Sequence, residues 1–206
     1  ASGRAAGDRL VFEEKAGLVP MDIRRESSTV VSTRLAAPQP LTLVEEIDPA
    51  FVAEAVGLTE GDIAGRPVIA STGVPFLFAE LKSREALRAA AGRRDGFEKH
   101  LPPERAVGIH LYVPVRDENV ALQTRMFAPL YGVPEDPATG GANVTLAGLL
   151  AQRTPERDLA FATTVGQGFD MGRPSILELG ADKKGREHCR CNYRRFCQVG
   201  ECSRDG

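Results

Sequence analysis

The feature that most constrains the fold is an apolar segment that follows a cluster of glycines and prolines. Glycine and proline are concentrated between Gly132 and Gly141, and the residues from Ala142 to Leu150 are then largely apolar. A helix that is apolar almost all round has no face suited to water, so other elements must cover it on every side. The sequence therefore predicts a buried helix at the centre of a folded unit.

Most of the remaining regular segments are strands. Runs rich in β-branched or alternating apolar residues predict strands at 9–14, 18–23, 29–35, 66–71, 76–81, 107–115, 122–127, 159–165 and 174–179. Two further helices are predicted, one from the N-cap Asp48 to Gly57 and one from Ser83 to about Ala91. Short turns such as Ala16-Gly17 join several strands, so the pattern favours an α+β fold with mostly antiparallel sheets.

Charge and cysteine content argue against several classes of protein. The 206 residues carry a formal net charge of −2, which gives no global attraction to nucleic acid or to an anionic membrane. No apolar run approaches the roughly 20 residues of a membrane helix, and no signal peptide is visible. Cysteine is absent before Cys189, which is typical of an intracellular protein without disulfides. We expect a cytoplasmic protein that binds neither nucleic acid nor membrane.

The residues that carry chemistry lie at the start of the apolar helix, in the run Glu135-Asp136-Pro137-Ala138-Thr139-Gly140-Gly141. Glycines there leave the first backbone N–H groups bare at the positive end of the helix dipole, so this terminus suits a carboxylate or a phosphate. Asp136 lies beside the anion site, where it can exchange a proton or hold a polar group of a ligand. Asp and Thr are also common N-cap residues, so Asp136 and Thr139 can equally serve only to cap the helix.

This run resembles the signature of the phenazine-biosynthesis isomerase-like (PhzF-like) family, whose usual text is Glu-Asp-Pro-Ala-Thr-Gly-Ser-Ala. The resemblance covers the chain up to about Leu179 and includes further segments at 10–17, 72–77, 126–134 and 167–175. The run 135–143 is specific, whereas each of the other segments alone is weak. Membership implies the diaminopimelate-epimerase-like fold, in which two lobes, each a curved mixed or antiparallel sheet around a central helix, enclose the active site between them.

The resemblance also implies a chemistry, because members shift protons on small carboxylic acids without a metal or an organic cofactor. It makes Asp136 the catalytic acidic residue. It assigns substrate binding to a loop glycine and to the start of the buried helix: Gly73, Thr139, Gly140, Gly141 and Ala142. A homodimer is compatible with it. We divide the chain into a remnant of the N-terminal lobe (1–42), a second lobe with the motif (43–180) and an aberrant, disordered tail (181–206).

The first lobe departs from the family pattern. The family's catalytic Glu and a Gly-His-Ala-Thr-like segment precede the opening hairpin; neither occurs here, and Glu13 and Glu14 do not match the catalytic position. We therefore expect an N-terminally truncated member, with a catalytically inactive fragment that retains at most weak carboxylate binding as the alternative. Truncation predicts exposure of apolar hairpin residues: Leu10, Phe12 and Val19. In the motif, Gly141 replaces the common Ser, which keeps the backbone N–H and predicts an altered substrate preference.

The residues from about Lys184 fit the family pattern least. The family ends in an alternating strand that returns to the first lobe, but this stretch is polar and rich in Arg and Cys. One hypothesis is a shifted reading frame, because permitted codons read one nucleotide forward from Glu187 can spell Ser-Ile-Ala-Ala-Ala-Thr-Ile-Gly-Gly-Phe-Ala. A zinc site of His188 with four cysteines is less favoured, since the cysteines lack paired C-x₂-C spacing, and an Arg-rich nucleic-acid contact has little aromatic support. The prediction is a disordered, solvated tail.

Overall fold

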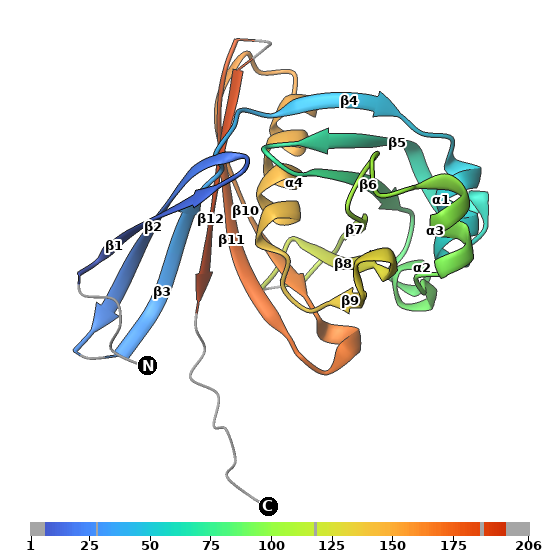
Figure 1. The fold of residues 1–206 in the computed structure, drawn as a ribbon, viewed down its shortest axis with the longest axis horizontal. Helices are drawn as coiled ribbons and strands as arrows, with labels where there is room; N and C mark the ends of the chain where they lie inside the picture. The colour runs from blue at the N-terminus through green and yellow to red at the C-terminus, as the bar shows by residue number, and fades with distance from the viewer. Residues whose placement is uncertain (1–6, 28, 118, 186–187, 197–206) are drawn as a thin grey trace, which may run out of the picture.

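The computed structural model describes residues 7–27, 29–117, 119–185 and 188–196, the last of these by its backbone alone. Within these ranges the strands form one continuous sheet in the order β1-β2-β3-β12-β11-β10-β8-β7-β6-β5-β4, with β9 paired to β8 (Figure 1). The strands are β1 Arg9–Glu14, β2 Gly17–Glu26, β3 Thr29–Ala36, β4 Thr42–Glu46, β5 Ile63–Ser71, β6 Pro75–Leu81, β7 Ile109–Pro114, β8 Leu122–Ala128, β9 Val133–Asp136, β10 Asp158–Gln167, β11 Ser175–Lys184 and β12 His188–Phe196.

Antiparallel pairing dominates this sheet, as the sequence predicts. Only the pairs β6/β7 and β8/β10 are parallel among the strand pairs of the described residues. The helices are α1 Pro49–Val56, α2 Arg84–Ala89, α3 Arg94–His100 and α4 Gly140–Arg153. The α+β class is therefore confirmed. None of these helices combines the length and the apolar character that crossing a membrane requires.

Helix α4 is enclosed by the curved sheet, which confirms the buried central helix. It packs against β10, β11, β12 and β5 (Figure 1), and nine of its residues are buried. Its core includes aromatic and aliphatic side chains from different parts of the sheet that encloses it, among them Phe76 of β6, Tyr112 of β7 and Leu177 of β11. A second core lies on the opposite face of β5–β8, where α1, α2 and α3 pack. The first core holds α4 against the sheet, and the second supports β5–β8 from the opposite face.

Helix α1 begins and ends where its sequence signals place it. The Asp48 carboxylate accepts a hydrogen bond from the N–H of Ala50 at 2.9 Å, Pro49 occupies the first helical position, and Gly57 ends the helix with a left-handed φ of 70°. These are the signals of an N-cap, of a proline at the first helical position and of a glycine C-cap.

The β1–β2 hairpin extends away from the α4 core (Figure 1). Phe12 is 44% exposed, and its neighbours Val11 and Leu18 are 55% and 63% exposed, so this part of the predicted apolar surface is present. Leu10 is half-buried. The prediction is wrong for Val19, which is only 4% exposed, because this residue faces the body of the molecule across the cavity described below.

The disordered tail predicted for 181–206 is contradicted in two places, because residues 181–184 belong to β11 and residues 188–196 form a strand of their own. This second strand is β12, which pairs antiparallel with β11 on one side and with β3 on the other. The ladder is made by backbone N–H and C=O groups, which every residue except proline carries, so a polar and Arg-rich sequence does not prevent it. Residues 186–187 and 197–206 lie outside the described part of the chain.

Candidate functional site

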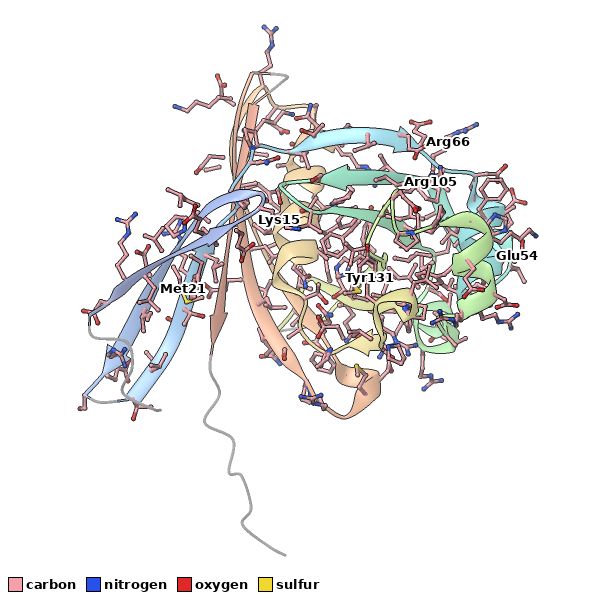
Figure 2. The ribbon with its side chains drawn as sticks, in the orientation of Figure 1. Lys15, Met21, Glu54, Arg66, Arg105 and Tyr131 are labelled. Atoms are coloured by element: carbon pink, nitrogen blue, oxygen red, sulfur yellow. The ribbon has the colours of Figure 1, made fainter. Side chains whose placement is uncertain are left out.

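A cavity of about 260 Å³ lies where the β1–β2 hairpin and the linker between β3 and β4 (37–41) meet the start of α4. Figure 2 shows the turn of the hairpin, marked by Lys15, beside α4. The lining comes from the hairpin, from β3 and the linker, from the 72–74 loop and from the helix: Glu14, Ala16, Val19, Leu35, Ala36, Ala37, Pro38, Thr72, Gly73, Val74, Gly140, Gly141 and Val144. Three of the predicted substrate-binding residues, Gly73, Gly140 and Gly141, therefore converge on one cavity.

The start of α4 offers unpaired backbone donors to this cavity. Within the part of the chain that the structure describes, the N–H groups of Gly140, Gly141 and Ala142 have no hydrogen-bond partner. Thr139 occupies the N-cap position but makes no side-chain cap hydrogen bond. Free N–H groups at the positive end of a 14-residue helix attract an anion. The predicted anion site at the start of α4 is therefore open, because no side chain caps it and it faces a cavity.

Gly73 closes the cavity on the side of the linker, and only glycine fits there. Its φ of 136° is unfavourable for other residues, and a Cβ would lie 2.8 Å from Pro38 Cγ and 2.9 Å from Ala16 Cβ. Gln39 fixes the same corner, because its backbone N–H donates to Thr72 O at 3.2 Å and its side-chain amide donates to Ala16 O at 2.8 Å. The hairpin, linker and 72–74 loop are held together around the cavity.

Asp136 is half-buried beside the helix start and is not among the residues that line the cavity. Its Oδ1 accepts a hydrogen bond from the N–H of Ala138 at 3.3 Å, and its Oδ2 accepts one from the hydroxyl of Thr139 at 2.8 Å. Ala142 is fully buried and Thr139 is 8% exposed, so their side chains face the protein interior. The structure therefore separates the predicted site residues into three glycines on the cavity and a polar turn behind it.

Glu135 anchors the motif to the rest of the fold. Arg125 donates from Nε and Nη2 to the two carboxylate oxygens of Glu135, at 2.7 Å each. Its Nη1 donates to the carbonyls at the end of α2, those of Leu87, Arg88 and Ala90. The Arg125 side chain is 11% exposed, so the pair is largely buried. It fixes the turn from which α4 begins.

Sequence reasoning missed the acidic side chain that lines the cavity. Glu14 ends β1 and lines the cavity, although it does not match the family's catalytic position. It is the one charged side chain among the described lining residues. The signal that could have found it is alternation along β1, because Glu14 points to the same face as Phe12 while Glu13 points to the other.

A buried polar cluster lies beneath α4. His110 on β7 is fully buried, and the side chain of Asn143 on α4 is a polar group beside its ring. Burial lowers the pKa of His110 to about 3, against a smaller raising effect of the neighbouring Asn143 side chain. His110 is therefore a neutral core residue.

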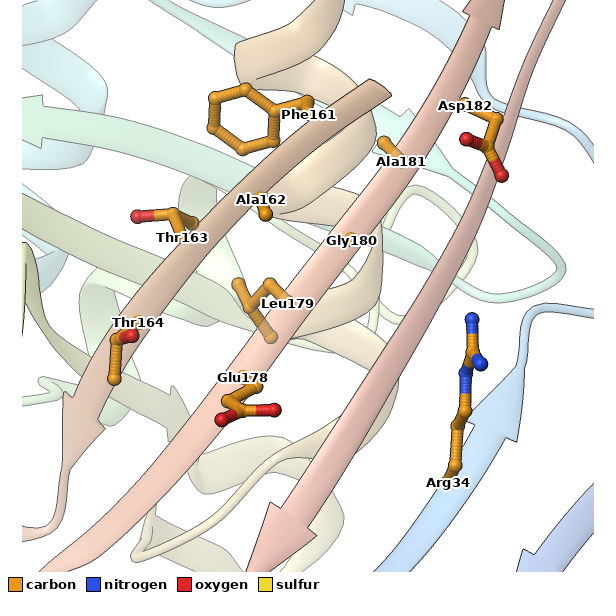
Figure 3. Close-up of a pocket in the computed structure, with 10 residues that line it drawn as sticks. All are labelled: Arg34, Phe161, Ala162, Thr163, Thr164, Glu178, Leu179, Gly180, Ala181 and Asp182. Atoms are coloured by element: carbon orange, nitrogen blue, oxygen red, sulfur yellow. The ribbon is translucent and has the colours of Figure 1, made fainter.

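A larger cavity, of about 520 Å³, lies on the other face of the sheet (Figure 3). Leu179 and Ala181 of β11 pack toward α4, so the alternating Glu178 and Asp182, with Arg34, lie on the face turned away from the helix. This cavity contains none of the predicted site residues. No cluster of three or more potential metal ligands occurs among the described residues, and the zinc alternative lies outside them because the side chains of residues 188–206 are not described.

Comparisons with known proteins reveal similarity over most of the chain. The family model described as phenazine biosynthesis-like protein matches residues 1–194. The chain is 31% identical over 198 residues to an uncharacterized isomerase of Deinococcus radiodurans, covering 89% of this chain and 61% of that protein. It is 31% identical over 184 residues to the trans-2,3-dihydro-3-hydroxyanthranilate isomerase of Pseudomonas aeruginosa, covering 86% of this chain and 60% of the relative. The chain thus spans about three-fifths of the length of these curated relatives.

Solved structures support the same fold. A phenazine biosynthesis protein of the PhzF family from Bacillus anthracis superposes with a TM-score of 0.76 at 21% identity, covering 92% of this chain and 66% of that one. A hydroxyproline epimerase from Agrobacterium vitis with bound trans-4-hydroxy-L-proline superposes with a TM-score of 0.55 at 15% identity, covering 94% of this chain and 58% of that one. The epimerase-like architecture predicted from the motifs is therefore confirmed.

Proposed function

The chain belongs to the phenazine biosynthesis-like protein family, and we propose that it acts as an isomerase or epimerase that shifts a proton on a small carboxylic acid in the α4 cavity. The observation that carries the proposal is the convergence of Gly73, Gly140 and Gly141 on one cavity, at a helix start whose N–H groups have no partner among the described residues. No metal or organic cofactor takes part in the proposed reaction. Cytoplasmic location and a homodimeric assembly stay predictions.

In this proposal the carboxylate of the ligand binds to the N–H groups of Gly140, Gly141 and Ala142. A carboxylate is matched to these donors in charge and in geometry, because the helix dipole and the N–H groups point at the same place. The apolar side chains of Val19, Leu35 and Val144 then contact the carbon skeleton and exclude part of the water. This orientation places the carbon next to the carboxylate within the cavity, where a carboxyl side chain exchanges its proton.

Two carboxyl groups are candidates for that exchange. Asp136 is the candidate by family resemblance, and ligand entry would have to release it from Thr139 and Ala138. Glu14 is the candidate by position, because it already lines the cavity.

The experiment that tests the proposed function is incorporation of solvent deuterium into candidate carboxylic acids, followed by proton NMR in D₂O. Suitable compounds are trans-2,3-dihydro-3-hydroxyanthranilate and trans-4-hydroxy-L-proline, which the names of the similar proteins suggest.

Variants separate the two roles. Loss of exchange in Asp136→Asn assigns the proton transfer to Asp136, and loss in Glu14→Gln assigns it to Glu14. Glu13→Gln is the matched control, because Glu13 is the neighbouring carboxylate on the opposite face of β1 and is absent from the lining. An isomerase that loses exchange equally in all three variants would contradict both assignments.

Carboxylate binding without turnover is the second candidate function. It is favoured by the position of Asp136, which lies outside the cavity lining with both carboxylate oxygens already accepting hydrogen bonds. Benzoate titration followed in the amide spectrum distinguishes the two functions. Shifts of the Gly140 and Gly141 signals without deuterium exchange on any substrate support binding alone. Absence of both shifts and exchange contradicts the carboxylate site itself.

A further inference from the structure

We propose that Gln167 is a positioning residue that prevents Thr139 from capping its own helix, and so keeps the first N–H groups of α4 available to a carboxylate. The inference rests on the proposed carboxylate site, because it explains why that site stays open. Gln167 ends β10, and the sequence gives no sign of this role, because it lies 28 positions from Thr139.

Every hydrogen-bonding position of the Gln167 side chain is used. Its Nε2 donates to the backbone oxygen of Asp136 at 2.7 Å and to Thr139 Oγ1 at 3.0 Å. Its Oε1 accepts from the N–H of Thr139 at 3.1 Å and from Asn143 Nδ2 at 2.6 Å. The residue is 1% exposed. A primary amide with both donors and both lone pairs engaged has one orientation, so Gln167 holds the 136–139 turn rigidly.

This holding changes what the hydroxyl of Thr139 does. A Thr at the N-cap normally accepts a hydrogen bond from the second or third helical N–H. Here the oxygen accepts from Gln167 Nε2, and its proton is directed to Asp136 Oδ2 at 2.8 Å. The side chain is therefore turned sideways, and no side-chain cap forms on α4. The N–H groups that Thr139 would otherwise satisfy are left to the cavity.

The arrangement leaves donors at the helix start unsatisfied. Asn143 is fully buried and donates to Thr139 O and to Gln167, and its side chain also lies beside His110. An uncapped helix start destabilises a fold. A sequence that keeps one beside a cavity is in local conflict, and such conflicts concentrate at functional sites.

The backbone beside Gln167 is fitted to the same turn. Gly168 has a φ of 79°, and a Cβ there would lie 2.8 Å from Pro137 O and 2.3 Å from Arg173 O. The end of β10 therefore approaches the 136–139 turn as closely as a backbone can. This close approach keeps the Gln167 amide within bonding distance of Asp136 and Thr139.

The test compares Gln167→Met, Gln167→Glu and the double variant Gln167→Met/Thr139→Val with the unmodified chain. Methionine preserves size and removes all four hydrogen bonds. Glutamate preserves the acceptors and removes both donations, to Asp136 O and to Thr139 Oγ1, and it serves if the methionine variant does not fold. Gln123→Met is the matched control, since Gln123 lies beside β10 on β8 and its Oε1 has no partner among the described residues.

Two measurements are made by amide NMR: hydrogen exchange of the Gly141 and Ala142 N–H groups, and titration with sodium benzoate. In both single variants Thr139 turns to cap the helix, so exchange slows at least fivefold and benzoate affinity falls at least tenfold. The double variant cannot cap, so both values return toward those of the unmodified chain. The control changes neither.

Two results would overturn the inference: unchanged exchange in both single variants, or a double variant that is further from the unmodified chain than Gln167→Met is. A purely structural role of Gln167 predicts the second result, because each lost hydrogen bond then adds to the damage. Failure of the proposed function is separate. In that case the unmodified chain does not bind benzoate, while the exchange measurement still decides whether Gln167 prevents capping.

Discussion

Replacement of Arg125 by Met is expected to destabilise the fold far more than loss of a typical ion pair. The guanidinium and the Glu135 carboxylate are only 11% and 15% exposed, and the arginine also donates to three carbonyls at the end of α2. Removing one partner of a buried pair leaves the other charge buried and unpaired, which costs about 3–5 kcal/mol. That is a large fraction of the roughly 5–15 kcal/mol that stabilises an ordinary domain.

Urea unfolding followed by circular dichroism measures the effect. Arg24→Met is the matched control, because Arg24 and Glu26 form an exposed pair with side chains 63% and 67% accessible. Its loss is expected to change the unfolding free energy by less than about 1 kcal/mol. The double variant Arg125→Met/Glu135→Met removes both buried charges, so it should recover part of the lost stability. An Arg125→Met protein within about 1 kcal/mol of the unmodified chain would refute the reasoning.

Three further variants test other parts of the site. Gly141→Ala should raise the unfolding free energy by about 0.4–1 kcal/mol, because the added Cβ would meet Phe76 at an ordinary contact distance of 3.6 Å. The variant should still bind benzoate, because its backbone N–H is kept. A loss of stability in urea would contradict this prediction. Gly168→Ala should lower stability by at least about 1–2 kcal/mol, since its φ of 79° is left-handed and its Cβ would clash with backbone oxygens. Burial lowers the pKa of His110 to about 3 in the folded state, whereas the unfolded chain has the ordinary value of about 6.5. Between these two values the folded state binds fewer protons than the unfolded chain. The stability that His110 contributes is therefore fully present above about pH 6.5 and is lost as the pH falls toward 3. Between about pH 7.5 and pH 5 the unmodified chain should therefore lose about 2 kcal/mol more than His110→Phe does, and equal losses in parallel urea titrations would be evidence against a neutral His110.

The elements with strong local signals were predictable from the sequence. The hairpin around Ala16-Gly17, the capped helix α1 and the buried helix α4 each depend on residues close together in the chain. Helix α3 was missed because its N-cap, Arg93, makes no side-chain cap hydrogen bond and because Gly96 interrupts it. The structure explains that glycine: a Cβ there would lie 2.6 Å from Ala55 Cα, so α3 depends on close packing against α1.

The candidate site was predictable only where it depends on residues close together in the chain. The glycines at the start of α4 predict an anion site from their local chemistry alone, and in the structure they line a cavity. The pairing of Glu135 with Arg125 and the contact of Gln167 with Thr139 join residues 10 and 28 positions apart. Such contacts depend on which strand ends meet in the sheet, and no local pattern encodes that.

The placement of β12 has a consequence for the order in which the sheet can assemble. Residues 9–36 join the rest of the sheet only through β12 among the described pairings, although β3 ends at Ala36 and β12 begins at His188. Wide separation in the chain delays such pairing, since the intervening loop must close before any contact rewards it. Helix α4 also packs against β11 and β12, so the wall that carries Glu14 can dock only on a sheet whose β11 and β12 strands already cover this helix. The cavity at the start of α4 is thus completed late in folding.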